Sequence, residues 1–135
     1  MAGGKNAASD YVIGSKDIVK IVNGEQIVMW NPDVIITNSN PSREVILKNS
    51  AFQTLNAIKN KRVYVVPTGV YLWSVRSAEG ALQPLWLGKM LYPERFGDLS
   101  LEKEVKYFYK EFYHYDVSDD EVKMILEGSE KTLLR

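Results

Sequence analysis

Two short apolar runs rich in β-branched residues are the clearest strand signals in the sequence. They cover residues 34–36 and 62–66, and both are apolar almost throughout, which is typical of strands buried on both faces of a parallel sheet. Between them lie a predicted helix from Pro41 or Ser42 to about Asn49 and a further short one at residues 55–58. This strand–helix–strand order predicts a βαβ unit.

The rest of the chain has helical periodicity. The predicted helix before the first strand is interrupted by Asn23-Gly24 and ends at Asn31-Pro32, because a residue before proline avoids the α region. Ser100 and Ser118 are predicted N-caps, and Ser118 forms a capping box with Glu121. The predicted helices outside the βαβ unit cover residues 18–30, 82–90, 101–112 and 119–126.

Apolar spacing predicts which helical residues are buried. In the third of these helices the apolar stripe consists of Leu101, Val105, Phe108 and Phe112. We therefore expect an α/β fold with a small, mostly parallel sheet flanked by helices and a helix-rich C-terminal half. Residues 11–13 are a candidate third strand. Residues 1–128 are expected to form one folded unit, with a frayed tail at 129–135.

Composition narrows the class of protein. The chain has 135 residues, of which 45% are hydrophobic and 25% are charged, as in one globular domain. Seventeen Lys and Arg residues balance seventeen Asp and Glu residues, so the overall charge does not indicate a nucleic-acid partner. The absence of cysteine excludes disulfides, zinc ribbons and cysteine nucleophiles. The first residues have no apolar signal segment, so we expect either a cytoplasmic protein or an internal piece of an exported one.

Motifs for catalysis are absent from the sequence. It has no G-x-S-x-G elbow, no P-loop and no G-x-G-x-x-G turn. The single histidine is His114. No feature of the sequence supplies a nucleophile for it to activate, so we interpret it as a partly exposed structural residue. We therefore expect no catalytic residues and no metal ligands.

The loop after the second predicted strand carries the best local signal for binding. Tyr71, Trp73 and Arg76 lie in this loop, and ligands of open α/β sheets bind in loops at the carboxyl ends of strands. Aromatic rings offer stacking area, and arginine offers a planar, permanent cation for anionic groups. The alternative is that Trp73 packs beneath the loop while Arg76 pairs with Glu79.

Four segments of the chain form a recognisable set. They are EQIVMWNPDVII at residues 25–36, LNAIKNKRVYVVP at 55–67, WLGKMLYPERF at 86–96 and FYKEFY at 108–113. Together they resemble the solute-binding proteins of iron–siderophore, haem and cobalamin ABC importers. The resemblance extends over most of the chain, from about Gly3 to Gly128.

The resemblance implies a fold and a non-enzymatic function. In that family two α/β lobes are joined by a long helix and hold a metal chelate between them, and the matching segments belong to the C-terminal lobe. It therefore implies that the chain is one lobe of an extracytoplasmic receptor, either periplasmic or a cell-surface lipoprotein. This receptor would deliver a ferric siderophore, haem or cobalamin to an ABC permease and would need no cofactor. A lobe without its partner lobe is expected to self-associate and to bind ligand weakly or not at all.

The resemblance also suggests roles for individual residues. Tyr71, Trp73 and Arg76 occupy the family's cleft-edge loop, and Asn6 lies in a segment that resembles a second cleft-edge loop. Glu44 follows the first strand and is the candidate for docking to the permease.

Three other interpretations remain open at this stage. Related receptors with this fold bind molybdate or tungstate, and Arg76 suits such an oxyanion equally well. A small cytoplasmic enzyme is a different class, which the missing nucleophile and acid–base pair disfavour. A stand-alone interaction module is a third.

Overall fold

The computed structural model describes residues 2–9 and 21–129. The candidate strand at residues 11–13 and nearly all of the expected tail at 129–135 lie outside the described residues. None of the described helices is both long enough and apolar enough to cross a membrane.

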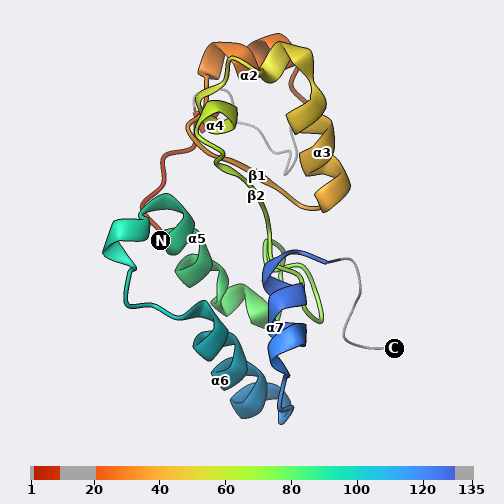
Figure 1. The fold of residues 1–135 in the computed structure, drawn as a ribbon, viewed down its shortest axis with the longest axis vertical. Coiled ribbons are helices and arrows are strands. Elements are labelled where there is room, and N and C mark those ends of the chain that lie inside the picture. Colours follow the sequence, from red (N-terminus) through yellow and green to blue (C-terminus); the bar gives the residue numbers. More distant parts are fainter. Residues whose placement is uncertain (1, 10–20, 130–135) are drawn as a thin grey trace.

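A small parallel sheet lies near the middle of the molecule (Figure 1). Strands β1 (Ile35–Thr37) and β2 (Val63–Val65) pair in parallel with Ile36 opposite Tyr64. The chain crosses from one strand to the other through α3 (Asn40–Lys48), the short helix η1 (Ser50–Phe52) and α4 (Asn56–Lys59). The expected βαβ unit is therefore confirmed.

Helix α2 (Gly24–Trp30) precedes the sheet and begins where the sequence pattern is interrupted. The Asn23 side chain accepts a hydrogen bond from the Gln26 backbone N–H, so the Asn-Gly pair starts the helix rather than breaking it. Asn31 ends α2 in the left-handed conformation with φ of 40°.

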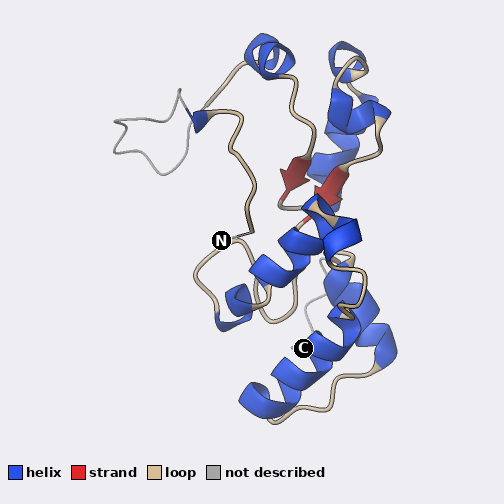
Figure 2. Ribbon diagram, turned by 90° about the vertical axis from the view of Figure 1, so that its left-hand side faces the viewer, coloured by secondary structure: helices blue, strands red, loops and turns tan. Residues whose placement is uncertain are grey.

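The C-terminal half is helical, as expected (Figure 2). The Ser118 side chain and Glu121 form the predicted capping box at the start of α7, and Ser100 caps α6. His114 ends α6 as an exposed residue with φ of 53°. The elements of this half are η2 (Ala78–Ala81), α5 (Gln83–Leu91), η3 (Pro93–Arg95), α6 (Leu101–Tyr113) and α7 (Asp119–Leu126).

The main core lies between α5, α6, α7 and the loop that follows β2. Its buried members include Val66 and Trp73 from that loop and Trp86 from α5. In α6 the expected burial of Leu101, Val105 and Phe108 is confirmed. The helices of the C-terminal half therefore form the base on which the loop after β2 rests.

Phe112 does not belong to this core, contrary to the expected stripe. It is 65% exposed, and Tyr109 is buried in its place. The ring of Phe112 packs against Phe108 with a centroid distance of 4.9 Å, and nothing covers its outer side among the described residues. Tyr109 is drawn inward because its hydroxyl has a hydrogen-bond acceptor in the core, the Glu79 carboxylate.

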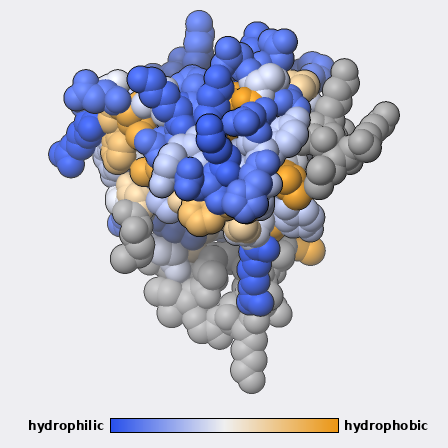
Figure 3. Space-filling model, turned by 90° about the horizontal axis from the view of Figure 1, so that it is seen from below, coloured by the Kyte–Doolittle hydropathy of each residue, from blue (hydrophilic) through white to orange (hydrophobic). Residues whose placement is uncertain are grey.

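Exposed apolar side chains are the feature of the structure that bears on the predicted association of the chain with itself. Ile21, Met29 and Val45 are largely exposed, and the outer edge of β1 has no strand partner among the described residues. The described atoms at the opposite end of the molecule are mostly hydrophilic, with only small apolar patches (Figure 3). Tyr107, Phe112 and Tyr115 are also exposed in and just after α6, so exposed apolar side chains occur in both halves of the described chain.

We expect light scattering to give a mass above that of the monomer as the protein concentration rises towards about 1 mM, because burying these side chains between copies is favourable. The double variant Met29→Lys/Val45→Lys should shift the equilibrium towards monomer. A single monomeric species at every concentration would contradict this prediction.

Candidate functional site

Two loops meet at the carboxyl ends of the parallel strands. Asn38 directly follows β1, and Ser74 lies in the long loop after β2. The Ser74 hydroxyl donates to Asn38 Oδ1 across 3.2 Å, and both residues are exposed. We call the surface formed by Asn38, Tyr71, Ser74 and Arg76 the carboxyl-end surface.

Tyr71 and Arg76 are both accessible on this surface, as the sequence predicted. Tyr71 is 60% exposed and Arg76 is exposed. Arg76 forms no ion pair with any described residue, so its guanidinium is available to an anion. The two loops thus carry a permanent positive charge, a phenol, an amide and a hydroxyl, all of which can hydrogen-bond to oxygen atoms.

Trp73 lies in the core and not on this surface. Its exposed fraction is 0%, and it packs in the main core cluster beneath the loop. The loop folds back because the Trp73 backbone N–H donates to the Pro67 carbonyl over 3.1 Å. We expected Trp73 to contact the ligand directly, but in this structure its ring is buried and cannot do so.

Glu79 takes a position that neither interpretation of the sequence foresaw. It forms no ion pair with Arg76, because its side chain turns inward and is 0% exposed. Its carboxylate accepts hydrogen bonds from the backbone N–H groups of Val70 (3.2 Å) and Tyr71 (2.8 Å) and from the Tyr109 hydroxyl. Burial raises the pKa of Tyr109 well above its usual range, and the hydrogen bond to Glu79 adds to this, so the hydroxyl keeps its proton.

The structure does not bring Asn6 together with the carboxyl-end surface. The segment that contains Asn6 follows Gly3, whose carbonyl accepts a hydrogen bond from the Tyr92 hydroxyl after α5. That end of α5 is held by Arg62, which immediately precedes β2 and donates to the Met90 and Leu91 carbonyls. The start of this segment therefore lies towards the amino ends of the strands, whereas Tyr71 and Arg76 follow the carboxyl end of β2.

Glu44 is exposed on α3 and paired with Lys48. The distance from Lys48 Nζ to Glu44 Oε2 is 2.9 Å, one helical turn apart. The hydrogen bond from Lys48, followed by the charge of Lys48, lowers the pKa of Glu44. Glu44 is therefore an ionised carboxylate at the surface, as an electrostatic docking residue has to be.

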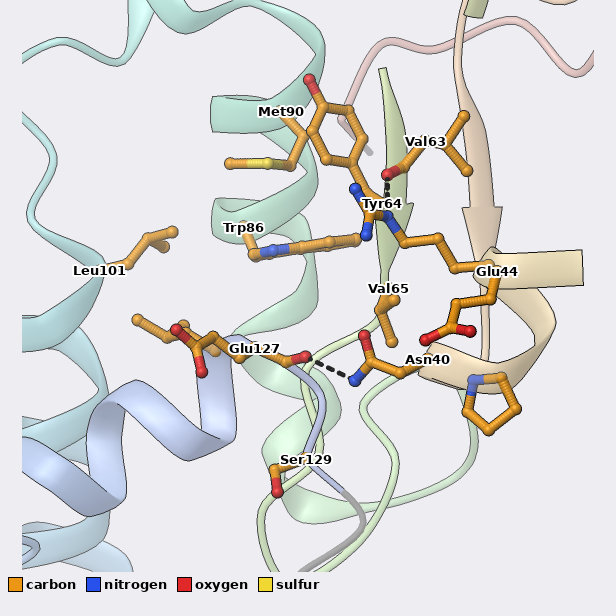
Figure 4. A pocket seen from close by; sticks show the side chains of 13 residues that line it. Asn40, Glu44, Val63, Tyr64, Val65, Trp86, Met90, Leu101, Glu127 and Ser129 are labelled. Carbon is orange, nitrogen blue, oxygen red and sulfur yellow. Dashed lines mark hydrogen bonds between the residues drawn. The ribbon is translucent and has the colours of Figure 1, made fainter. Parts of the chain in front are cut away.

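Glu44 also lines an open groove of about 970 Å³ that runs beside β2 (Figure 4). Trp86 and Met90 of α5 line one side of this groove, and α3 lies on the other. Asn40 bridges it at one end by donating to the Glu127 and Gly128 carbonyls. Tyr71 and Arg76 do not line the groove, so the permease-docking candidate and the carboxyl-end surface are separate features.

The sequence contained signals for the residues that we missed. Asn38 belongs to a polar turn cluster after a predicted parallel strand, and parallel strands bring their carboxyl ends to one edge. Ser74 lies in the same loop as the predicted ligand-binding residues Tyr71 and Arg76. Glu79 had no such signal, because a carboxylate between small residues in a loop is usually solvated.

Among the described residues, no group of three or more His, Asp or Glu side chains could hold a metal ion.

Comparisons with known proteins give a consistent result. The chain is 34% identical over 122 residues to the molybdate-binding protein MolA of Haemophilus influenzae, an alignment that covers 88% of this chain and 34% of MolA. The structure of MolA bound to molybdate has 31% identity and a TM-score of 0.69, and the match covers 87% of this chain and 36% of that one.

Two further solved structures are similar. A periplasmic solute-binding protein from Veillonella parvula has 34% identity and a TM-score of 0.77, with 93% of this chain and 39% of that chain covered. An ABC transporter solute-binding protein from Sulfurospirillum deleyianum has 31% identity and a TM-score of 0.69, with 77% and 32% covered. The chain thus spans about a third of the length of these relatives, between 32% and 39% of each.

The family described as periplasmic binding protein matches residues 1–69 of the 135. This region contains α2, the βαβ unit and the first residues after β2. The observed small parallel sheet with flanking helices agrees with the folds of the solved relatives. On this evidence the chain belongs to the periplasmic binding protein family.

Proposed function

We propose that this chain forms one lobe of the solute-binding component of an ABC importer and that its carboxyl-end surface contacts an oxyanion such as molybdate. The observation that carries the proposal is the exposed guanidinium of Arg76, which has no anionic partner among the described residues. An arginine without a carboxylate partner, at the carboxyl end of a parallel sheet, suits a ligand that brings its own negative charge.

The hydrogen-bonding groups around Arg76 also suit an oxyanion. The Tyr71 hydroxyl and the Asn38 amide can donate to the oxygen atoms of such a ligand, and both residues are exposed. The similarity to MolA, which is a molybdate-binding protein, supports this class of ligand over a ferric chelate. A ferric siderophore, haem or cobalamin is the second candidate, on the resemblance of the sequence alone.

The remaining parts of the proposal concern partner and location. The similarity to an ABC transporter solute-binding protein supports a membrane permease as the partner and an extracytoplasmic site of action. Glu44 is proposed to dock to basic groups of that permease, since its carboxylate is exposed and ionised. An importer receptor of this kind is not an enzyme and releases its ligand unchanged.

Titration of the 135-residue chain with sodium molybdate, followed by NMR of the backbone amides, tests the ligand. We expect shifts confined to Asn38 and the loop of residues 68–77, with a dissociation constant of about 1 mM or weaker, because one lobe supplies only part of the contacts. Arg76→Ala should raise that constant at least about tenfold through loss of a charge-assisted contact.

Arg95→Ala is the matched control, because Arg95 is also exposed but lies after α5, over the ring of Tyr92. It should leave the molybdate titration unchanged. Parallel titrations with tungstate, a ferric hydroxamate and haem compare the two ligand classes. Shifts in this loop with a chelate and none with molybdate would replace the oxyanion by the second candidate. The absence of loop shifts with every ligand, or shifts that Arg76→Ala does not alter, would overturn the proposed surface.

A further inference from the structure

A buried carboxylate lies directly beneath the carboxyl-end surface. Glu79 belongs to η2, and all of its side chain is inaccessible to solvent. No Lys, Arg or His among the described residues forms an ion pair with it. Its partners are instead two consecutive backbone N–H groups, of Val70 and Tyr71, and one phenol, of Tyr109.

Burying a carboxylate without a cation is unfavourable unless hydrogen bonds replace the lost hydration. An apolar side chain would fill the same space without this cost, so packing alone does not account for an acid at this position. Here each carboxylate oxygen accepts from the backbone of the loop that carries Tyr71. The carboxylate thus fixes the loop backbone at the residue whose side chain reaches the surface.

Two other contacts tie the loop to η2. The Ser77 hydroxyl donates to the Leu72 carbonyl, and the Ser77 oxygen accepts from the Gly80 backbone N–H as the cap of η2. A Cβ atom at Gly69 would overlap the Glu79 carboxylate and the Tyr109 hydroxyl, so the backbone passes immediately beside them. Loop, η2 and α6 are therefore joined at one buried point.

We propose that Glu79 is a positioning residue that holds the loop after β2 in the conformation that leaves Tyr71 and Arg76 exposed at the carboxyl-end surface. It acts through the backbone at residues 70 and 71 and does not touch the ligand. Because these two N–H groups already bind Glu79, they are not available to an anion, whereas the side chains of Tyr71 and Arg76 remain among the donors that this loop offers. The statement about ligand donors rests on the proposed function, whereas the statement about loop conformation does not.

Hydrogen exchange of backbone amides in the 135-residue chain tests the positioning role directly. In Glu79→Gln, one carboxylate oxygen becomes an NH₂ group that faces an N–H donor. We expect the exchange rate of the Val70 or Tyr71 amide to rise at least about tenfold, with amides of α6 and α7 changing less than about threefold. Tyr109→Phe keeps both backbone hydrogen bonds and should raise these rates only about threefold or less.

Glu111→Gln is the matched control, since Glu111 is exposed on the same helix as Tyr109 and should change neither rate. Unchanged rates at residues 70 and 71 in Glu79→Gln would overturn the proposal, and so would an equal acceleration in α6 and α7, which indicates a general loss of stability. If Glu79→Gln does not fold, Glu79→Asp replaces it. Its carboxylate is retained but withdrawn by one methylene, and the same selective acceleration is expected.

The molybdate titration is then repeated on the folded variants. Glu79→Gln should weaken binding at least about fivefold while Glu111→Gln does not, because the loop no longer holds its donors together. If the unaltered chain fails to bind molybdate, the proposed function fails and the exchange data still decide the positioning role. If the unaltered chain binds and Glu79→Gln binds equally well, the positioning role fails and the proposed function stands.

Discussion

Replacing Gly69 by alanine should lower the free energy of unfolding by about 2–3 kcal/mol, the upper part of the range seen when an atom is forced into a filled interior. The added methyl group would overlap the Tyr109 hydroxyl and the Glu79 carboxylate. Both groups are buried and bound to each other, so neither can move aside without breaking hydrogen bonds. Urea unfolding followed by circular dichroism measures the change.

Gly97→Ala is the matched control for this substitution. A Cβ atom at Gly97 has no neighbour within 4 Å, and its backbone does not have the positive φ that favours glycine. We expect Gly97→Ala to leave stability within about 1 kcal/mol of the original chain. Equal stability of the two alanine variants would show that the space beside Gly69 is not filled as described.

The local structure could be predicted from the sequence because its signals are local. The β-branched runs became β1 and β2, and the Ser118 capping box started α7. These features depend on side chains a few residues apart and on the spacing of apolar residues along each helix or strand. The accessibility of Tyr71 and Arg76 also followed, because a loop after a parallel strand is open to ligands.

The misassigned side chains depend on contacts between segments far apart in the chain. Tyr109 is buried and Phe112 is exposed because Glu79, thirty positions away from Tyr109, supplies a buried acceptor. The meeting of Asn38 with Ser74 likewise joins residues thirty-six positions apart. Apolar spacing along one helix cannot report such partners, because it carries no information about what the opposite segment contains.

The same reasoning explains the place of Trp73. A tryptophan beside a tyrosine and an arginine in a loop suggests a stacking surface, but a loop that rests on helices also needs an apolar anchor. Trp73 supplies this anchor, since the loop turns back through its hydrogen bond to Pro67 and buries the indole in the core. Because the buried Trp73 anchors the loop to the core, Tyr71 and Arg76 are held at the surface.

Trp73→Ala should destabilise the chain by about 3–5 kcal/mol, as expected when a fully buried aromatic ring is removed. Trp73→Phe should cost clearly less, because a ring remains and the indole Nε1 has no hydrogen-bond partner to lose. Tyr71→Ala should leave stability within about 0.5 kcal/mol of the original chain, because its side chain is mostly exposed.

Urea unfolding of the three variants measures these differences. The molybdate titration on the variants that fold then distinguishes a residue that anchors the loop from one that contacts the ligand. If Trp73→Ala kept full stability and lost only the molybdate shifts, the indole would be a ligand contact after all and the loop would have to be anchored elsewhere.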